Sequence, residues 1–250
     1  RKERHFRANV GLSWGILLLI LVFLFSGQEI TIGSQTFSTI KIDTQFILNE
    51  IDFIAGGLGQ TLLISVLSIM LAIVLALLAA LGRLSTIPPI YAVSTFYVSL
   101  IRGTPLYLQI FFFFLALPQL GIILSGVFAG VLALGLNYGA YMSEIFRAGL
   151  ASVGKGQREA AMALGMTPTQ TMRRVILPQA LRFAIPPVGN EFIAMTKDSA
   201  LVSATGFVHE LTWRAVKVGR AQFHNLEALI MAAIFYWTMT IILSYPYLAQ

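Results

Sequence analysis

The chain has 250 residues, of which 57% are hydrophobic and only 11% are charged. A soluble globular domain usually has roughly 25% charged residues, so the composition argues against a water-soluble fold and indicates an integral membrane protein. The formal net charge is +6, but the Lys and Arg residues are scattered between apolar segments, which argues against a nucleic-acid partner. The absence of cysteine excludes disulfides and thiolate metal sites, and we predict no metal site.

The first apolar run, from Leu12 to Phe25, follows a basic start. A signal peptide begins in the same way, but no convincing small-residue cleavage site follows Phe25. We therefore predict a signal-anchor span at residues 11–26. The polar segment 27–54 has weak strand-like alternation at Ile30-Thr31-Ile32 and is expected to form an external connector.

Further apolar segments reach the length of about 20 residues that a membrane-crossing helix needs. They predict spans near residues 56–81, 104–124, 125–148, 188–207 and 226–248. The stretch 85–101, which contains Pro88-Pro89, either lies in the interface or extends the third span. The chain is thus predicted to be an all-α integral membrane protein with about six spans. We divide it into an N-terminal anchor and connector (1–55) and a transmembrane domain (56–250).

The distribution of Lys and Arg in the short loops predicts the orientation. With the N-terminus in the cytoplasm, the inner segments 1–10, 82–105 and 147–183 hold four, two and six basic residues. The outer segments 27–54 and 209–225 hold one and three. The bias places both ends of the chain in the cytoplasm.

The segment from Gly154 to Pro178 is predicted to form two cytoplasmic helices. Residues 157–164 are mostly strong helix formers, and Gly165 is placed to end that helix in a left-handed conformation. Thr167 is a suitable N-cap for the second helix, with Pro168 at its first position and Gln170 as capping-box partner. The small side chains of the first helix let another protein approach its backbone closely.

This segment resembles the EAA loop of binding-protein-dependent ABC importers, through Glu159-Ala160-Ala161, three further residues, Gly165, and Ile176-Leu177-Pro178. The resemblance implies a type I ABC importer-like transmembrane domain whose loop, at about 154–166, is the coupling helix that contacts an ATPase. The coupling residues implied are Gly156, Glu159, Ala160, Ala161, Leu164 and Gly165. The chain itself then binds no cofactor and is not an enzyme, since ATP and magnesium belong to the partner ATPase.

Other motifs narrow the resemblance to the polar amino acid permease branch. They are Arg102-Gly103-Thr104-Pro105, Tyr141 with Glu144 and Arg147, Pro178-Gln179-Ala180-Leu181-Arg182, and Asn190 followed by Lys197-Asp198-Ser199. Ala200 departs from the branch, which commonly has Lys-Thr-Ser or Lys-Asp-Thr-Ser there. The resemblance implies a multi-pass protein of the bacterial inner membrane that imports polar or charged amino acids by alternating access. The implied partners are two ATPase subunits, a second permease subunit, identical or related, and an external binding protein.

Polar residues inside the predicted spans are candidates for the substrate pathway, because charges in a membrane usually face a cavity or pair with one another. Asn190 and Lys197 are seven residues apart and share a helix face, and Glu191 and Asp198 share the adjacent face. The candidate pathway residues are Thr104, Tyr141, Glu144, Asn190, Glu191, Lys197, Asp198 and Ser199. Pairing within the scaffold is the alternative, for example between Glu144 and Arg147.

An ion-coupled secondary carrier is the alternative function, with Lys197 and Asp198 as an ion relay and no need for an ATPase. The EAA loop argues against it, as does the absence of a visible internal repeat. Enzymatic function has no support, because no Ser/His, paired-Asp or HExxH arrangement appears.

Overall fold

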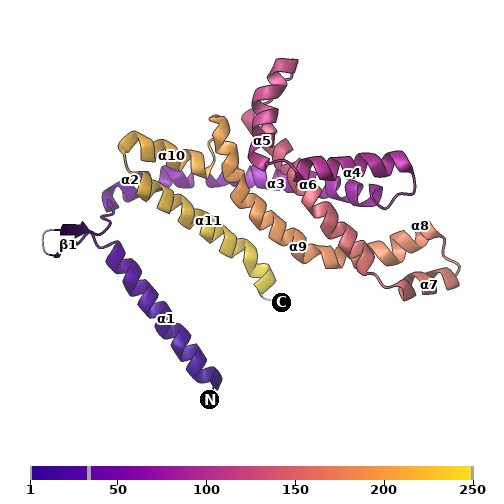
Figure 1. Ribbon diagram of the computed structural model, residues 1–250, viewed down its shortest axis with the longest axis horizontal. Coiled ribbons are helices and arrows are strands. Elements are labelled where there is room, and N and C mark those ends of the chain that lie inside the picture. Colours follow the sequence, from indigo (N-terminus) through magenta and orange to yellow (C-terminus); the bar gives the residue numbers. More distant parts are fainter. Residues whose placement is uncertain (1, 33–34, 249–250) are drawn as a thin grey trace.

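The computed structural model describes residues 2–32 and 35–248, and most of this part of the chain is helical (Figure 1). The first elements are α1 (Lys2–Leu24), β1 (Glu29–Ile32), β2 (Gln35–Ser38), α2 (Thr44–Ala55), α3 (Leu58–Gly82) and α4 (Pro88–Arg102). The middle elements are α5 (Leu106–Phe111), the π-helix η1 (Phe112–Ala116), the 3₁₀-helix η2 (Leu117–Leu120), α6 (Gly126–Ser152) and α7 (Lys155–Ala163). The last are α8 (Pro168–Thr171), the π-helix η3 (Met172–Ile176), α9 (Leu177–Asp198), the 3₁₀-helix η4 (Ser199–Thr205), α10 (Leu211–Gln222) and α11 (Asn225–Leu248).

Among the described residues, two helical stretches are long and apolar enough to cross a membrane by themselves, Thr44–Gly82 and Asn225–Tyr245. A third is present if Pro88–Arg102 and Leu106–Leu120 form one span that bends by 104°. In that case the ambiguous stretch 85–101 is the first half of a broken span, and the predicted span 104–124 contains the second half. The sequence alone left this open because a bend depends on how the halves pack.

The core is built on close contact between α3 and α6. Ala72, Ala76 and Ala80 recur every four residues along α3 and are buried against α6, where Leu134 and Met142 are also buried. Small residues let two membrane helices approach closely, which increases van der Waals contact. A second apolar cluster joins α2, α10 and α11. Figure 1 shows this second group at the opposite end of the molecule from α7 and α8.

The N-terminal helix α1 lies apart from the other helices in Figure 1. Its residues from Asn9 to Leu24 are exposed, which suits an apolar helix surrounded by lipid. The strands β1 and β2 follow as an antiparallel hairpin in which Glu29 pairs with Ser38 and Ile32 with Gln35. The predicted connector therefore contains a hairpin and the helix α2, which continues toward α3.

Candidate functional site

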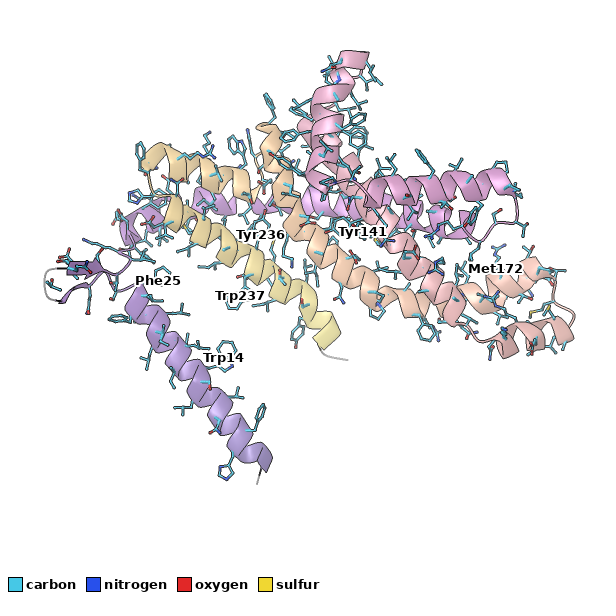
Figure 2. All side chains as sticks on the ribbon, viewed as in Figure 1. Trp14, Phe25, Tyr141, Met172, Tyr236 and Trp237 are labelled. Atoms are coloured by element: carbon cyan, nitrogen blue, oxygen red, sulfur yellow. The ribbon has the colours of Figure 1, made fainter. Side chains whose placement is uncertain are left out.

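A cavity of about 540 Å³ lies where the chain passes from α4 to α5. Its walls come from this break, α6 and α9, and consist of Arg102, Gly103, Thr104, Pro105, Leu106, Asn137, Tyr138, Tyr141, Glu191 and Asp198. Figure 2 shows Tyr141 close to the point where α5 leaves α4. The volume is in the range of small-molecule binding sites.

The break that forms one wall of the cavity follows from local sequence. Pro105 has no backbone N–H and disfavours a helical conformation at Thr104, so α4 ends at Arg102 and α5 begins at Leu106. The Thr104 hydroxyl donates a hydrogen bond to the Leu100 carbonyl oxygen at 3.0 Å, which satisfies one acceptor near the end of α4. Non-helical backbone inside a membrane is tolerated where it lines a cavity.

The cavity carries charges of both signs. Glu191 and Asp198 line it from α9, where their spacing of seven residues places them on one face. The Tyr138 hydroxyl, on α6, donates a hydrogen bond to Asp198 Oδ2 at 2.8 Å. Arg102 supplies the cation, and its Cζ lies 5.0 Å from the centre of the Tyr141 ring. The lining thus presents one cation and two acidic side chains to a ligand.

The structure brings together half of the predicted substrate-pathway residues. Thr104, Tyr141, Glu191 and Asp198 line the cavity, whereas Asn190 and Lys197 are exposed and lie outside its lining. Ser199 is buried, and its hydroxyl donates to the Thr196 carbonyl oxygen at 2.7 Å.

Glu144, the remaining predicted pathway residue, lies outside the cavity lining and forms an ion cluster between three helices. Its carboxylate pairs with Arg83 at the end of α3 and accepts a hydrogen bond from Arg147 Nε at 2.8 Å. Arg102 Nη1 lies 3.7 Å from Glu144 Oε1. The pairing of Glu144 with Arg147 is as the sequence suggested, and Arg102 connects the cluster to the cavity.

Sequence reasoning did not place Arg102 and Asn137 among the site residues. Arg102 belongs to the Arg102-Gly103-Thr104-Pro105 motif, but it lines the cavity only because the chain breaks between α4 and α5. Asn137 is a polar residue between Leu136 and Tyr138 in an apolar helix. Because polar side chains are rare in membrane helices, the sequence alone could have marked Asn137 as a candidate functional residue.

The two helices predicted between Gly154 and Pro178 are confirmed. The first is α7, and Gly165 follows it with a φ of +77°, in the left-handed region that favours glycine. The second starts with the capping box between Thr167 and Gln170 and with Pro168 in its first turn. The loop lies at one end of the molecule in Figure 1, and Figure 2 shows Met172 at the same end.

The predicted coupling residues differ in their accessibility. Ala161 is buried, whereas the others are exposed: Gly156, Glu159, Ala160, Leu164 and Gly165. Leu164 is 80% exposed, although it is a large apolar residue. The Arg158 guanidinium donates to the Leu150 carbonyl oxygen at 3.0 Å and holds α7 against the end of α6. The exposed apolar face on a fixed helix is typical of a protein contact.

In the described ranges, no group of three or more His, Cys, Asp or Glu side chains could hold a metal ion.

Residues 72–248 match a family described as the binding-protein-dependent transport system inner membrane component. The chain is 39% identical over 207 residues to the arginine transport system permease protein ArtQ of Bacillus subtilis (strain 168), which covers 82% of this chain and 94% of ArtQ. It is 42% identical over 192 residues to the L-cystine transport system permease protein TcyB of the same organism, covering 76% and 82%.

Two solved structures are similar to this chain. The crystal structure of an amino acid ABC transporter with histidines superposes with a TM-score of 0.77 and 38% identity, over 82% of this chain and 95% of the other. An inward-facing form of the MetNI methionine ABC transporter has a TM-score of 0.60 at 17% identity, over 83% and 99% of the two chains. The second similarity shows the fold alone.

Proposed function

Because the chain belongs to the family of binding-protein-dependent transport system inner membrane components, we propose that it carries polar or charged amino acids inward across the membrane, driven by ATP. It is a multi-pass protein of the inner membrane and a permease subunit of an amino acid ABC importer. ATP and magnesium bind to separate ATPase subunits, and this chain binds no cofactor. Residues 1–55 act as anchor and external connector, and residues 56–250 form the permease domain.

The cavity is the observation that carries the substrate proposal. A zwitterionic amino acid presents a carboxylate and an ammonium group, and a guanidinium is well suited to bind the first. Arg102 serves as that cation, and Glu191 and Asp198 face the ammonium group. Since acidic side chains outnumber the cation in the lining, a substrate with additional positive charge, such as arginine, binds best. The name of ArtQ, an arginine transport permease, is consistent with this preference.

The loop at 154–166 transmits the ATPase cycle. Its exposed residues Glu159, Ala160 and Leu164 seat in a groove of the ATPase, and the small side chain of Ala160 allows close approach of the backbones. Two permease subunits, two ATPases and an external binding protein form the working complex. Closure of the ATPases moves the spans through α7, so that the cavity opens alternately to the two sides.

The test is radiolabelled amino-acid uptake into proteoliposomes that contain this chain, its partner permease, the ATPase and the binding protein. Ion gradients are collapsed and ATP is supplied on the ATPase side. We expect uptake that requires both ATP and the binding protein, with arginine competing more strongly than glutamate. In a parallel reaction with an ion gradient and no ATP, uptake would contradict the proposal and favour a secondary carrier. Stronger competition by glutamate would contradict the assigned charge preference.

A further inference from the structure

The buried side chain of Gln109, on α5, bridges the break between α4 and α5. It is 6% exposed. Its amide nitrogen donates to the Ile101 carbonyl oxygen and to Thr104 Oγ1, both at 2.9 Å, and lies 3.2 Å from the Thr104 carbonyl oxygen. The last carbonyl groups of a helix have no partner within that helix. Gln109 therefore satisfies the end of α4 from within α5 and connects the two halves of the broken span.

The same side chain is bonded to the cavity wall. Asn137 Nδ2, on α6, donates to Gln109 Oε1 at 3.2 Å, and Asn137 lines the cavity. Among the described residues, the side-chain oxygen of Asn137 makes no hydrogen bond, so this acceptor is available to a ligand. An unbroken series of polar groups thus leads from the cavity, through Asn137 and Gln109, to the backbone of the break.

The half-span α4 is attached to α6 at the neighbouring position. The Tyr97 hydroxyl, on α4, donates to the Leu136 carbonyl oxygen at 2.7 Å. Consecutive residues of α6, Leu136 and Asn137, therefore hold α4 and α5 respectively. With α4 fixed by Tyr97, the bond between Asn137 and Gln109 is positioned to set the angle of α5.

We propose that the Asn137–Gln109 amide pair couples occupation of the cavity to the bend between α4 and α5. An ammonium group that donates to the free oxygen of Asn137 polarises and reorients this amide, which alters its bond to Gln109. Gln109 in turn holds the carbonyl groups that end α4. Gln109 is a positioning residue in this scheme, because it lies outside the cavity lining and acts through Asn137. The inference depends on the proposed function, since the ligand is the transported amino acid.

The absence of cysteine makes the bend measurable by site-directed spin labelling. Val93 on α4 and Leu115 on η1 are 70% and 56% exposed, so labels on cysteines introduced there report the angle without disturbing the core. The complete complex is placed in lipid nanodiscs, and the intrachain distance distribution is recorded with and without arginine. We expect arginine to shift the distribution in the otherwise unaltered chain and to leave it unshifted in Gln109→Met, which keeps the side-chain length but lacks its hydrogen bonds.

Binding and transport are measured on the same variants. Gln109→Met should lower the maximal rate of arginine uptake about tenfold, a factor within the usual range of coupling between two sites. KM should change less than about threefold. Gln109→Glu keeps the acceptor for Asn137 but loses the donors to Ile101 and Thr104, and it should behave in the same way. Gln179→Met is the matched control, because Gln179 Nε2, on α9, donates to the Val175 carbonyl oxygen of η3 at 3.0 Å, outside the cavity lining.

The outcomes separate the two proposals. If the otherwise unaltered complex binds no arginine, the proposed function fails and the coupling fails with it. If arginine binds but the label distance is unchanged, or shifts equally in Gln109→Met and Gln109→Glu, the coupling is wrong and the proposed function stands. If Gln179→Met loses the shift as well, the effect is not specific to the amide pair, and the coupling is also wrong.

Discussion

The Tyr138 hydroxyl on α6 donates a hydrogen bond to Asp198 Oδ2 at the end of α9, across a distance of 2.8 Å. Both residues line the cavity, so this bond fixes the carboxylate against the wall while one of its oxygens stays available to a ligand. The two helices that carry them also pack against each other. The bond therefore joins the packing of the permease to the orientation of an acidic group in its cavity.

Replacement of Tyr138 by Phe should weaken substrate binding. A hydrogen bond to a charged group contributes about 1.5–3 kcal/mol. Without it the Asp198 carboxylate is less well oriented, so part of this energy is lost from substrate binding. We expect KM for ATP-driven uptake to rise roughly tenfold, which corresponds to about 1.4 kcal/mol. Tyr236→Phe is the control, because the Tyr236 hydroxyl also donates to a carboxylate, Glu210 Oε2 at 2.9 Å, but lies outside the cavity lining. An equal rise in KM for both variants would refute the role of the Tyr138–Asp198 bond.

Replacement of Ala160 by Phe should uncouple uptake from ATP hydrolysis. Ala160 is exposed on α7, so the added ring does not disturb the permease but obstructs the ATPase. Overpacking costs about 1–3 kcal/mol, and uptake should fall roughly ten- to hundredfold. Uptake and ATPase copurification are measured together. Ala221→Phe, at an exposed alanine in α10, should leave both unchanged. Normal uptake by the Ala160 variant would disprove the docking role.

Replacement of Gly57 by Ala should destabilise the end of the molecule formed by α2, α10 and α11. A Cβ atom at Gly57 would lie 2.6 Å from the backbone N and Cα of Leu211, so α10 would have to move. The expected loss is about 1–3 kcal/mol of stability, measured by thermal unfolding in detergent. At Gly59 a Cβ atom meets nothing within 4 Å, and Gly59→Ala should be neutral or slightly stabilising because alanine favours a helix. Similar unfolding temperatures for the two variants would contradict this prediction and mean that α10 shifts to accommodate the Cβ atom without loss of stability.

The carboxyl of Glu210 should make stability depend on pH. It is fully buried at the N-terminus of α10. Burial raises its pKa above the ordinary value of 4.5, although hydrogen bonds from the backbone N–H groups of Thr212 and Trp213 act in the opposite direction. The folded protein therefore holds the proton more tightly than the unfolded chain does, and this contribution to stability is lost as the pH rises above 4.5.

Glu210→Gln provides the reference for that prediction, because glutamine stays neutral. The stability of the unaltered chain relative to Glu210→Gln should be constant below pH 4.5 and should decrease as the pH rises above it. Thermal unfolding at a series of pH values measures the difference. A relative stability that increases with pH would mean that the hydrogen bonds from Thr212, Trp213 and Tyr236 outweigh burial.

The local features of the segment from Gly154 to Pro178 could be predicted from the sequence. Gly165 ends α7 in the left-handed conformation, and Thr167 with Gln170 caps the next helix, because both features depend on neighbouring residues alone. The path of the chain at residues 85–124 could not be predicted in the same way. Pro105 indicates an interruption, but the 104° bend occurs together with contacts of Tyr97 and Gln109 to α6, a helix distant in the sequence.

The sequence by itself determined that this protein is a helical membrane protein, because an apolar run of about 20 residues in lipid can satisfy its backbone hydrogen bonds within one helix. It also determined the local structure of the loop at 154–166 and the start of the next helix, whose capping and turn residues act over a few positions. Only the tertiary structure decided that Arg102 and Asn137 join Glu191 and Asp198 around one cavity while Lys197 lies outside its lining. The face of each helix that lines the cavity is set by packing against helices that are distant in the sequence. The order of residues along the chain does not contain that geometry.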